Sequence, residues 1–435
     1  MDQRTSGDTE PLVLPRDQHC ISRADINDNA LKVLYRLHQA GFAAYLVGGG
    51  VRDLLMNMHP KDFDIATDAS PEQIKELFRN CRLIGRRFRL AHIHFGRDIV
   101  EVATFRGHHL DDHSDEQALT HDGMILRDNV FGTLAEDAWR RDFSVNALYY
   151  NIADFSVVDY TGGMEDLNQR VLRMIGDAQI RCQEDPVRML RAIRFAAKLQ
   201  FNLDTDLLDA LATQRHRLAA VPPARLFDEI LKLFLGGFAL RTFHLLREHH
   251  LFEILFPVSA QHLDTDDQTF LALIEQACIN TDQRIAENKP VTPAFLFAVL
   301  LWGPLAQRAT EFESNGMSKI QSLQEAGRAL LHQQAVTIAI PKRFKLPIRD
   351  IWVGQARLLN RRGRRPYSML AQPRFRAIYD FLLLRAQSGE ANLSELSNWW
   401  TQFQLADEQE RKTMCQQLHH QRHGQRPRRK KPRDA

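Results

Sequence analysis

Apolar positions along the first third of the chain change from helical spacing to short runs. A helical pattern starts at residue 26, and a glycine follows where a helix would end: Ile26, Ala30, Val33, Leu34, Leu37 and then Gly41. Strand-like apolar runs come next, separated by turn residues. These runs are AAYLV (43–47), KDFDIAT (61–67), LAHIHFG (90–96) and DIVEVATF (98–105). The pattern predicts a mixed α/β unit over residues 26–155.

Within this unit, the segment SPEQIKELFRNC (70–81) carries the signals of a helix start. Ser70 has a side chain that caps helices, and Pro71 suits the first helical position. In contrast, residues 107–128 are polar and have no sustained periodicity. We expect a helix at the first segment and a long loop at the second.

Beyond residue 155 the pattern is almost entirely helical. Helical stretches include PVRMLRAIRFAAKL, PARLFDEILKLFL, LRTFHLLREHHLF, PAFLFAVLLW and FRAIYDFLLLRA. The pattern predicts five segments: a disordered start over 1–25, the α/β unit over 26–155, a first helical part over 156–235, a second over 236–420, and a disordered basic tail over 421–435.

Composition indicates the cellular location of the protein and shows that its positive charge is concentrated at the C-terminal end. The 435 residues contain no run of apolar residues long enough to span a membrane, and the first residues do not resemble a secretory signal. Five scattered cysteines without a CxxC pair favour reduced thiols, so we expect a cytoplasmic protein. Residues 421–435 carry seven Lys or Arg and one Asp. This tail is either a solvated end or an arm that binds nucleic-acid phosphates.

The first candidate functional residues lie between residues 47 and 68. Asp62 and Asp64 lie two apart on a predicted strand, so both carboxylates should point to one face, where Mg²⁺ could hold them together. The glycine triplet that begins with Gly48 and Gly49 lies between a predicted strand and a helix, where backbone amides can approach an anion. Arg52 could add a charge. Each feature alone is weak, since DxD pairs and glycine turns also occur in plain surface structure.

Taken together, the motifs resemble the class II nucleotidyltransferases, the superfamily of bacterial poly(A) polymerases and tRNA CCA-adding enzymes. The glycine turn and the DFD motif match its first motif, and four further stretches follow in order: VEVATFR (100–106), EDAWRRDFSVNALYY (136–150), VDYTGGMEDL (158–167) and EDPVRMLRAIRFAAKL (184–199). The resemblance implies an α/β nucleotidyltransferase head of the polymerase β-like kind, followed by an all-α neck, body and tail.

The resemblance also implies roles for individual residues. Asp62 and Asp64 would bind two Mg²⁺ ions, with Mn²⁺ as a possible substitute, for in-line phosphoryl transfer. Asp142 is the favoured third catalytic carboxylate, and Glu101 is the alternative. Arg140, Arg141, Asp142 and Asn146, on a predicted helix, would read ribose and phosphate, while Asp185 and Arg188 would meet the base edge. The nucleotide-binding set is Gly48, Gly49, Arg52, Arg141, Asn146, Asp185, Arg188, Arg191 and Arg194.

The reaction product and the binding partners remain to be chosen among alternatives. GRRFRLAHIHFG (85–96), IPKRFKLPIRDIW (340–352) and the arginine-rich end resemble the bacterial poly(A) polymerases. We therefore expect polyadenylation of RNA 3′ ends from ATP by a monomer, with RNA phosphates also held by the basic tail and with a role in mRNA processing and decay. CCA addition to tRNA is the alternative, and a non-catalytic RNA-binding protein is a third hypothesis.

Overall fold

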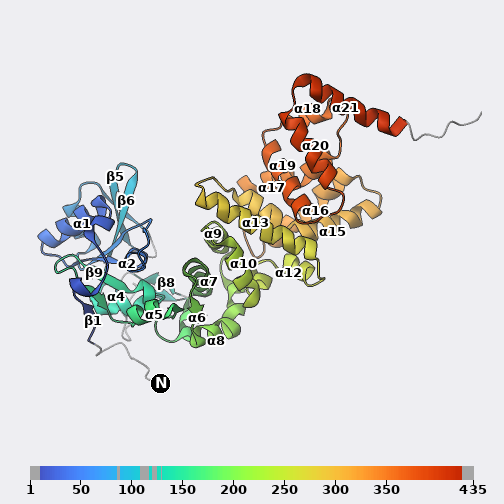
Figure 1. Cartoon of the computed structure of the whole chain (residues 1–435). Helices are drawn as coiled ribbons and strands as arrows, with labels where there is room; N and C mark the ends of the chain where they lie inside the picture. The colour runs from blue at the N-terminus through green and yellow to red at the C-terminus, as the bar shows by residue number, and fades with distance from the viewer. Residues whose placement is uncertain (1–9, 86–88, 108–116, 120–124, 129, 424–435) are drawn as a thin grey trace, which may run out of the picture. The chain divides into compact units, whose positions relative to one another are not determined.

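The computed structural model describes residues 10–85, 89–107, 117–119, 125–128 and 130–423, and it divides into two compact units (Figure 1). Unit 1 comprises Met1–Leu218, and unit 2 comprises Ala219–Ala435. The tail predicted to bind RNA phosphates lies almost wholly outside the described residues. The polar stretch 107–128 contains four histidines, His108, His109, His113 and His121, and these also lie outside the described residues.

Unit 1 is built on an eight-stranded sheet. Across the sheet the order is β1 (Leu12–Leu14), β10 (Val157–Asp159), β9 (Leu148–Asn151), β2 (Ala44–Val47), β3 (Asp64–Thr67), β6 (Asp98–Thr104), β5 (Leu90–Phe95) and β4 (Cys81–Ile84). All neighbours are antiparallel except β3 and β6. Two short strands, β7 (Gln117–Leu119) and β8 (Ile125–Asp128), pair within the stretch predicted to be a loop. The mixed α/β prediction is confirmed.

Four helices accompany this sheet: α1 (Asp28–Gln39), α2 (Gly49–Leu55), α3 (Pro71–Leu77) and α4 (Leu134–Arg140). The apolar positions of α1 that predicted a helix are buried, and α1 packs on β2, β3 and β6. At the start of α3, the Ser70 hydroxyl accepts from the Gln73 amide, while the Gln73 side chain accepts from the Ser70 amide. Periodicity and capping chemistry therefore located both helices from local sequence.

The disorder predicted for residues 1–25 is wrong for residues 10–25. Strand β1 pairs with β10 in the sheet, and two 3₁₀-helices follow, η1 (Arg16–Gln18) and η2 (Arg23–Asp25). The His19 ring bonds to the Phe155 carbonyl at 2.8 Å, and Ile21 is 1% exposed. A three-residue strand has too few residues to show periodicity. It is ordered by a distant partner, since even the nearest pair, Leu14 opposite Val157, is 143 residues apart.

The helical character predicted beyond residue 155 is confirmed, apart from three short strands. Strand β10 belongs to the main sheet, which therefore extends to Asp159, while β11 (Val171–Leu172) and β12 (Asn202–Leu203) pair with each other. The remaining elements of unit 1 are α5 (Gly163–Gln169), α6 (Ala178–Glu184), α7 (Val187–Leu199), α8 (Thr205–Gln214) and the 3₁₀-helices η3 (Ser144–Asn146) and η4 (Arg215–Ala220), the last of which crosses into unit 2.

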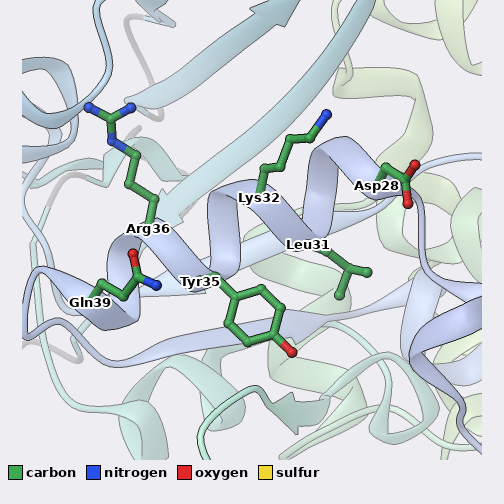
Figure 2. A pocket seen from close by; sticks show the side chains of 6 residues that line it. All are labelled: Asp28, Leu31, Lys32, Tyr35, Arg36 and Gln39. Atoms are coloured by element: carbon green, nitrogen blue, oxygen red, sulfur yellow. The ribbon is translucent and has the colours of Figure 1, made fainter.

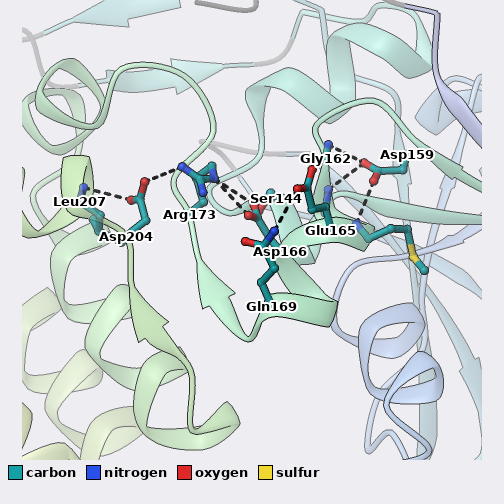
Figure 3. A network of polar contacts seen from close by, with 11 residues as sticks. Ser144, Asp159, Gly162, Glu165, Asp166, Gln169, Arg173, Asp204 and Leu207 are labelled. Atoms are coloured by element: carbon teal, nitrogen blue, oxygen red, sulfur yellow. Dashed lines mark hydrogen bonds and ion pairs between the residues drawn. The ribbon is translucent and has the colours of Figure 1, made fainter. Parts of the chain in front are cut away.

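A polar network joins the sheet to these helices (Figure 3). The buried Asp159 carboxylate accepts from four consecutive backbone amides, residues 161–164, at the start of α5. From α5, Asp166 accepts from the Ser144 hydroxyl at 2.5 Å and from Arg173, which also pairs with Asp204 at 2.7 Å. The network fixes η3, α5 and α8 to one another.

Unit 2 is helical throughout its described residues. Its helices are α9 (Pro223–Phe234), α10 (Ala239–Glu248), α11 (Phe252–Leu255), α12 (Pro257–Leu263), α13 (Gln268–Ala286), α14 (Pro293–Leu300), α15 (Trp302–Ser314), α16 (Lys319–Gln334), α17 (Lys342–Leu358), α18 (Arg365–Leu370), α19 (Phe375–Gln387), α20 (Ser394–Leu405) and α21 (Glu408–His423). Trp352 and Trp400 are fully buried, and their indole N–H groups donate to the Ala298 and Leu358 carbonyls at 3.0 and 2.9 Å.

In the described part of the chain, no helix has both the length and the apolar character that crossing a membrane requires.

Gly163 offers a test of the junction between α5 and η3. A Cβ at this position would lie 2.3 Å from the Ser144 carbonyl oxygen, so Gly163→Ala requires a backbone shift. We expect a loss of about 1–3 kcal/mol in the free energy of unfolding, although alanine is otherwise the better helix former. Urea unfolding measures this loss, and Gln169→Ala on the exposed end of α5 is the control. An equally stable Gly163→Ala protein would contradict the close contact.

Candidate active site

The glycine turn and the aspartate pair lie against each other in unit 1. Gly48 follows β2 and has φ 75° and ψ −136°, a backbone conformation that glycine adopts without steric strain. Helix α2 begins at the next residue, Gly49. A Cβ at Gly50 would lie 3.3 Å from the Asp62 carbonyl oxygen and 3.7 Å from the Phe63 ring. The small residues thus let the two halves of the first motif meet backbone to backbone.

Asp64, rather than Asp62, begins strand β3, and both residues reach the surface of unit 1. Parallel pairing of β3 with β6 sets Ile65 opposite Val102, so Asp64 lies beside Glu101. Loss of surrounding water and then the charge of Glu101 raise the pKa of Asp64 to about 6, with a smaller contribution from Asp62 and opposition from Arg141. Carboxylates concentrated in this way repel one another unless a cation or proton joins them.

Oxygen ligands of this kind match a hard divalent cation. Asp62, Asp64 and Glu101 supply carboxylate oxygens only, and the raised pKa of Asp64 shows that their charges are not balanced within the protein. Among the described residues, however, no group of three acidic, histidine or cysteine side chains is arranged to hold a metal. The donor chemistry fits Mg²⁺, whereas a closed cage of protein ligands is not formed.

Arg52 and Asn146, both predicted to bind nucleotide, are buried beneath the glycine turn. Arg52 is 2% exposed; it donates to Asp53 from Nε at 2.8 Å and to the Asn146 side-chain oxygen from Nη1 at 2.5 Å. Lys198 of α7 also pairs with Asp53, at 2.9 Å. The guanidinium lies 5.4 Å from the centre of the Phe195 ring. These groups bind one another and hold α2, η3 and α7 together.

Arg141 is the cation that faces the turn. Its Nη1 would be 3.7 Å from a Cβ at Gly48, and its charge acts on Asp64. Asp137 and Tyr149 accept its other N–H groups at 2.8 Å each. Burial lowers the pKa of Arg141, but Asp137 and Tyr149 outweigh burial and raise it above its ordinary value. Arg141 therefore stays charged.

The prediction that residues 141–146 lie on one helix is wrong. Helix α4 ends at Arg140, because the next residues exchange helical bonds for pairing with the segment after β11: Ser144 N–H donates to Arg173 O, and Ile175 N–H donates to Asp142 O. Burial of Phe143, 0% exposed, accompanies this pairing. Asp142 and Asn146 still approach each other, with 3.5 Å between the amide nitrogen and the carboxylate.

Of the two candidates for third carboxylate, Asp142 forms an ion pair with Arg191, whose Nε donates to it at 2.7 Å. Burial acts to raise the pKa of Asp142, but Arg191 and then Asn146 lower it below its ordinary value. Glu101 instead lies beside Asp64, and its Oε1 is 3.2 Å from His92 Nε2. The structure thus brings Glu101, and not Asp142, to the aspartate pair.

The predicted base-reading residues meet where α6 ends and α7 begins. The Asp185 carboxylate accepts from the Val187 amide at 3.3 Å. Arg188 Nη1 donates to the Arg181 carbonyl at 2.7 Å and to Glu184 at 2.8 Å. Arg194 lies over the Phe195 ring, 4.9 Å from its centre. The arginines of α7 that were predicted to bind nucleotide therefore have different partners, with Arg188 on Glu184 and Arg191 on Asp142.

Arg140, predicted to read ribose and phosphate, lies among further arginines at this junction, and two of them, Arg106 and Arg181, were not predicted as site residues. Burial, and then Arg106, Arg181, Arg188 and Arg141, lower the pKa of Arg140 to about 9. Burial and then the charge of Arg188 likewise lower the pKa of Arg181 to about 10, although Glu184 and Asp142 act to raise it. Arg181 Nη2 donates to the Arg141 carbonyl at 2.7 Å. The repulsion among these positive charges would be relieved by a bound anion. Arg181 lies seven residues before Arg188, a spacing that places both on one side of a helix, and this spacing was the sequence signal that could have identified it.

A separate hollow on unit 1 lies along α1 (Figure 2). Its lining comes from α1 alone: Asp28, Leu31, Lys32, Tyr35, Arg36 and Gln39. None of the predicted site residues contributes to it.

Three families match successive parts of the chain. "Poly A polymerase head domain" matches residues 44–173, "Probable RNA and SrmB- binding site of polymerase A" matches 200–263, and "Polymerase A arginine-rich C-terminus" matches 315–434. Among solved structures, the Bacillus stearothermophilus CCA-adding enzyme in complex with CTP is 23% identical, with 86% of this chain and 80% of that chain covered and a TM-score of 0.53. A tRNA-processing enzyme in an apo form is 20% identical, with 90% and 98% covered and a TM-score of 0.58. The fold and the head-domain match define a nucleotidyltransferase.

Full-length relatives identify the family within that class. Poly(A) polymerase I of Escherichia coli O157:H7 is 48% identical over 97% of this chain and 92% of its own length, and that of Haemophilus influenzae is 46% identical over 93% and 90%. The chain belongs to the poly(A) polymerase I family. A CCA-adding enzyme of Lactobacillus helveticus is 35% identical, but over 53% of this chain and 55% of its own. The family predicted from the motifs is confirmed.

The Asp64 environment predicts a dependence of stability on pH. Because folding raises its pKa from 3.8 to about 6, the folded protein binds the proton more tightly than the unfolded chain. The free energy of unfolding should therefore fall as pH rises through this window, and Asp64→Asn should melt higher than wild type at about pH 8 but not at about pH 4. Calorimetry without divalent metal checks this, with the exposed Glu76→Gln as control. A melting difference that is the same at both pH values would contradict the charge repulsion.

Proposed function

We propose that this protein adds AMP from ATP to the 3′-hydroxyl of RNA without a template and releases pyrophosphate. The observation that carries the proposal is the match to poly(A) polymerase I over nearly the whole chain, whereas the CCA-adding enzyme matches about half of it. The site supports it, because clustered carboxylates lie beside a glycine turn and an arginine that stays charged. Poly(A) addition of this kind would serve mRNA processing and decay.

Asp62, Asp64 and Glu101 are the residues that would hold Mg²⁺, or Mn²⁺ in its place. The bound metal would supply charge neutralisation at the reacting phosphate and lower the pKa of the RNA hydroxyl. The glycine turn lets the triphosphate approach the backbone, and Arg141 contributes a fixed positive charge beside Gly48. Asp142 has a different role in this proposal: it holds Arg191, while Arg52 and Asn146 support the turn from below.

Selection of adenine is assigned to Asp185 and Arg188. One donor group and one acceptor group at the α6–α7 junction could pair with the edge of a base, so the protein would replace a template. Arg188 is held there by the Glu184 carboxylate and the Arg181 carbonyl. A fixed guanidinium discriminates better than a mobile one, since less rotational freedom is lost on binding. Arg194, stacked on Phe195, would brace the same helix.

The wider setting is proposed as follows. The catalytic residues all come from unit 1, which is consistent with a monomer. All five cysteines are free thiols, as expected for the reducing cytoplasm. RNA would be held by regions that match RNA-binding and arginine-rich families, and the basic tail after residue 420 would add contacts to RNA phosphates.

Loss of either aspartate should abolish nucleotide addition. We expect Asp62→Asn and Asp64→Asn each to reduce incorporation of ATP into unstructured RNA by at least ~1,000-fold, because a metal ligand positions nucleophile and phosphate together. Gel assays of primer extension with each NTP measure the rate. Glu76→Gln should be as active as wild type. Near-normal extension by either aspartate variant would refute the catalytic assignment.

The same assay separates the two products. Long ladders with ATP alone are expected for poly(A) addition. Addition of one to three nucleotides that requires CTP, on tRNA ends, would instead establish the CCA-adding alternative.

Arg188 should control the choice of nucleotide. We expect Arg188→Ala to lower the ratio of kcat/KM for ATP over CTP by an amount equivalent to ~1–3 kcal/mol, the discrimination typical of a bidentate contact. RNA affinity should change less. Glu184→Gln keeps the guanidinium but weakens its anchor, so it should lie between wild type and Arg188→Ala. An unchanged ATP-to-CTP ratio in Arg188→Ala would exclude base reading by this side chain.

A further inference from the structure

Helix α17 of unit 2 begins with a concentration of positive charge. Four of its first eight residues are cations, Lys342, Arg343, Lys345 and Arg349, and its first turn contains no acidic residue. We call these four residues the α17 basic row. Residues 342, 345 and 349 share one helix face and advance ~4.5 and ~6 Å along the axis, so their charges form a line rather than a point.

This placement opposes the electrostatics of the helix itself. The N-terminus of a helix carries partial positive charge, and cations there are destabilising, while cations near the C-terminus are stabilised. The other end of α17 obeys the rule, since Arg357 lies in its last turn. Arg357 therefore has a structural reason to be basic. The α17 basic row has none within the helix, and its charge must be balanced from outside.

Neighbouring side chains do not provide that balance. Within the described residues, no ion pair is formed by any member of the row, whereas other cations of unit 2 have carboxylate partners: Arg328 with Glu325, Arg374 with Asp350, Arg376 with Asp380. The Nε of Arg349 is buried and has no hydrogen-bond partner in the described structure. An anion from solution could balance the charge of the exposed members of the row, Lys342 and Arg343.

The row lies beside an anchored aromatic ring and exposed apolar surface. Phe344, between Arg343 and Lys345, stacks on Phe227 of α9 with ring centres 5.8 Å apart, and Arg343 lies 4.9 Å from the centre of the Phe344 ring. Leu346 is 56% exposed beside them. Fixed cations interleaved with exposed apolar groups are the composition that binds single-stranded nucleic acid, by its phosphates and its bases together.

We propose that the α17 basic row binds the phosphate backbone of single-stranded RNA and is a substrate-holding site on unit 2. A line of cations favours an extended polyanion over a single small anion. The inference rests on the proposed function for the identity of the polyanion, but it can be tested by binding alone, without catalysis.

The test is RNA binding by full-length protein with Lys342→Gln, Arg343→Gln and Lys345→Gln combined. With a labelled oligoadenylate of about 20 nucleotides, the slope of log affinity against log salt should become shallower by about 2, because each single-strand phosphate contact contributes roughly 0.7. Affinity at about 50 mM salt should fall at least ten-fold. At saturating RNA, kcat should match wild type. Removal of cations that oppose the helix dipole should leave the melting temperature unchanged or higher.

The matched control removes three exposed cations that already have carboxylate partners: Arg328→Gln, Arg376→Gln and Lys412→Gln. It makes the same change in net charge, and its salt slope should remain close to that of wild type. Equal slopes and affinities in the two triple variants would overturn the proposal. Retained RNA affinity with lost binding to phosphatidylserine vesicles would also overturn it. If wild type binds RNA but incorporates no ATP, the proposed function fails while the binding result stands.

Discussion

The arrangement of unit 1 around the glycine turn depends on one buried guanidinium. Arg52 projects from α2 beneath the glycine turn, where Asp53 and Asn146 accept its hydrogen bonds and Phe195 packs against its plane. A buried charge of this kind requires all its partners, because loss of one leaves an uncompensated ion that costs about 3–5 kcal/mol. The requirement joins three segments distant in sequence: the glycine turn with α2, η3 and α7. The surface on which nucleotide would bind is shaped from below by this ion pair.

Around that centre, groups of like charge lie close together beside the ion pairs already described. Asp64 and Glu101 repel each other on one side, while Arg140, Arg181 and Arg188 crowd together on the other. A protein selected for stability alone would space these groups further apart. The crowding makes sense if a metal and a triphosphate complete the arrangement, because they bring the missing positive and negative charges. Binding energy is thereby available from relief of repulsion that already exists in the free protein.

Unit 2 combines a dense apolar core with a basic surface. Its two fully buried tryptophans, Trp352 and Trp400, donate their indole N–H groups to main-chain carbonyls, so large rings are buried without an unsatisfied donor. Some of its surface cations lie beside carboxylates, as Arg328, Arg374 and Arg376 do, but those at the start of α17 form no ion pair within the described residues. Charges without an opposite partner are therefore found both in the candidate active site and at the start of α17.

The sequence by itself determined the elements whose signals are local, and through its motifs it determined the family. The apolar spacing of α1, the Ser70 capping box and the DFD and EDPVR motifs all act within a few residues, and the structure has α1 and α3 where they were predicted. Tertiary structure decided the rest. Strand β1 exists because β10 pairs with it, and the RRDF segment leaves the helix because Arg173 and Ile175 take up its backbone groups. Parallel pairing of β3 with β6 set Glu101 beside Asp64, while Arg191 drew Asp142 away. Such outcomes depend on contacts between residues dozens of positions apart, and a linear pattern contains no signal of which partner will be near.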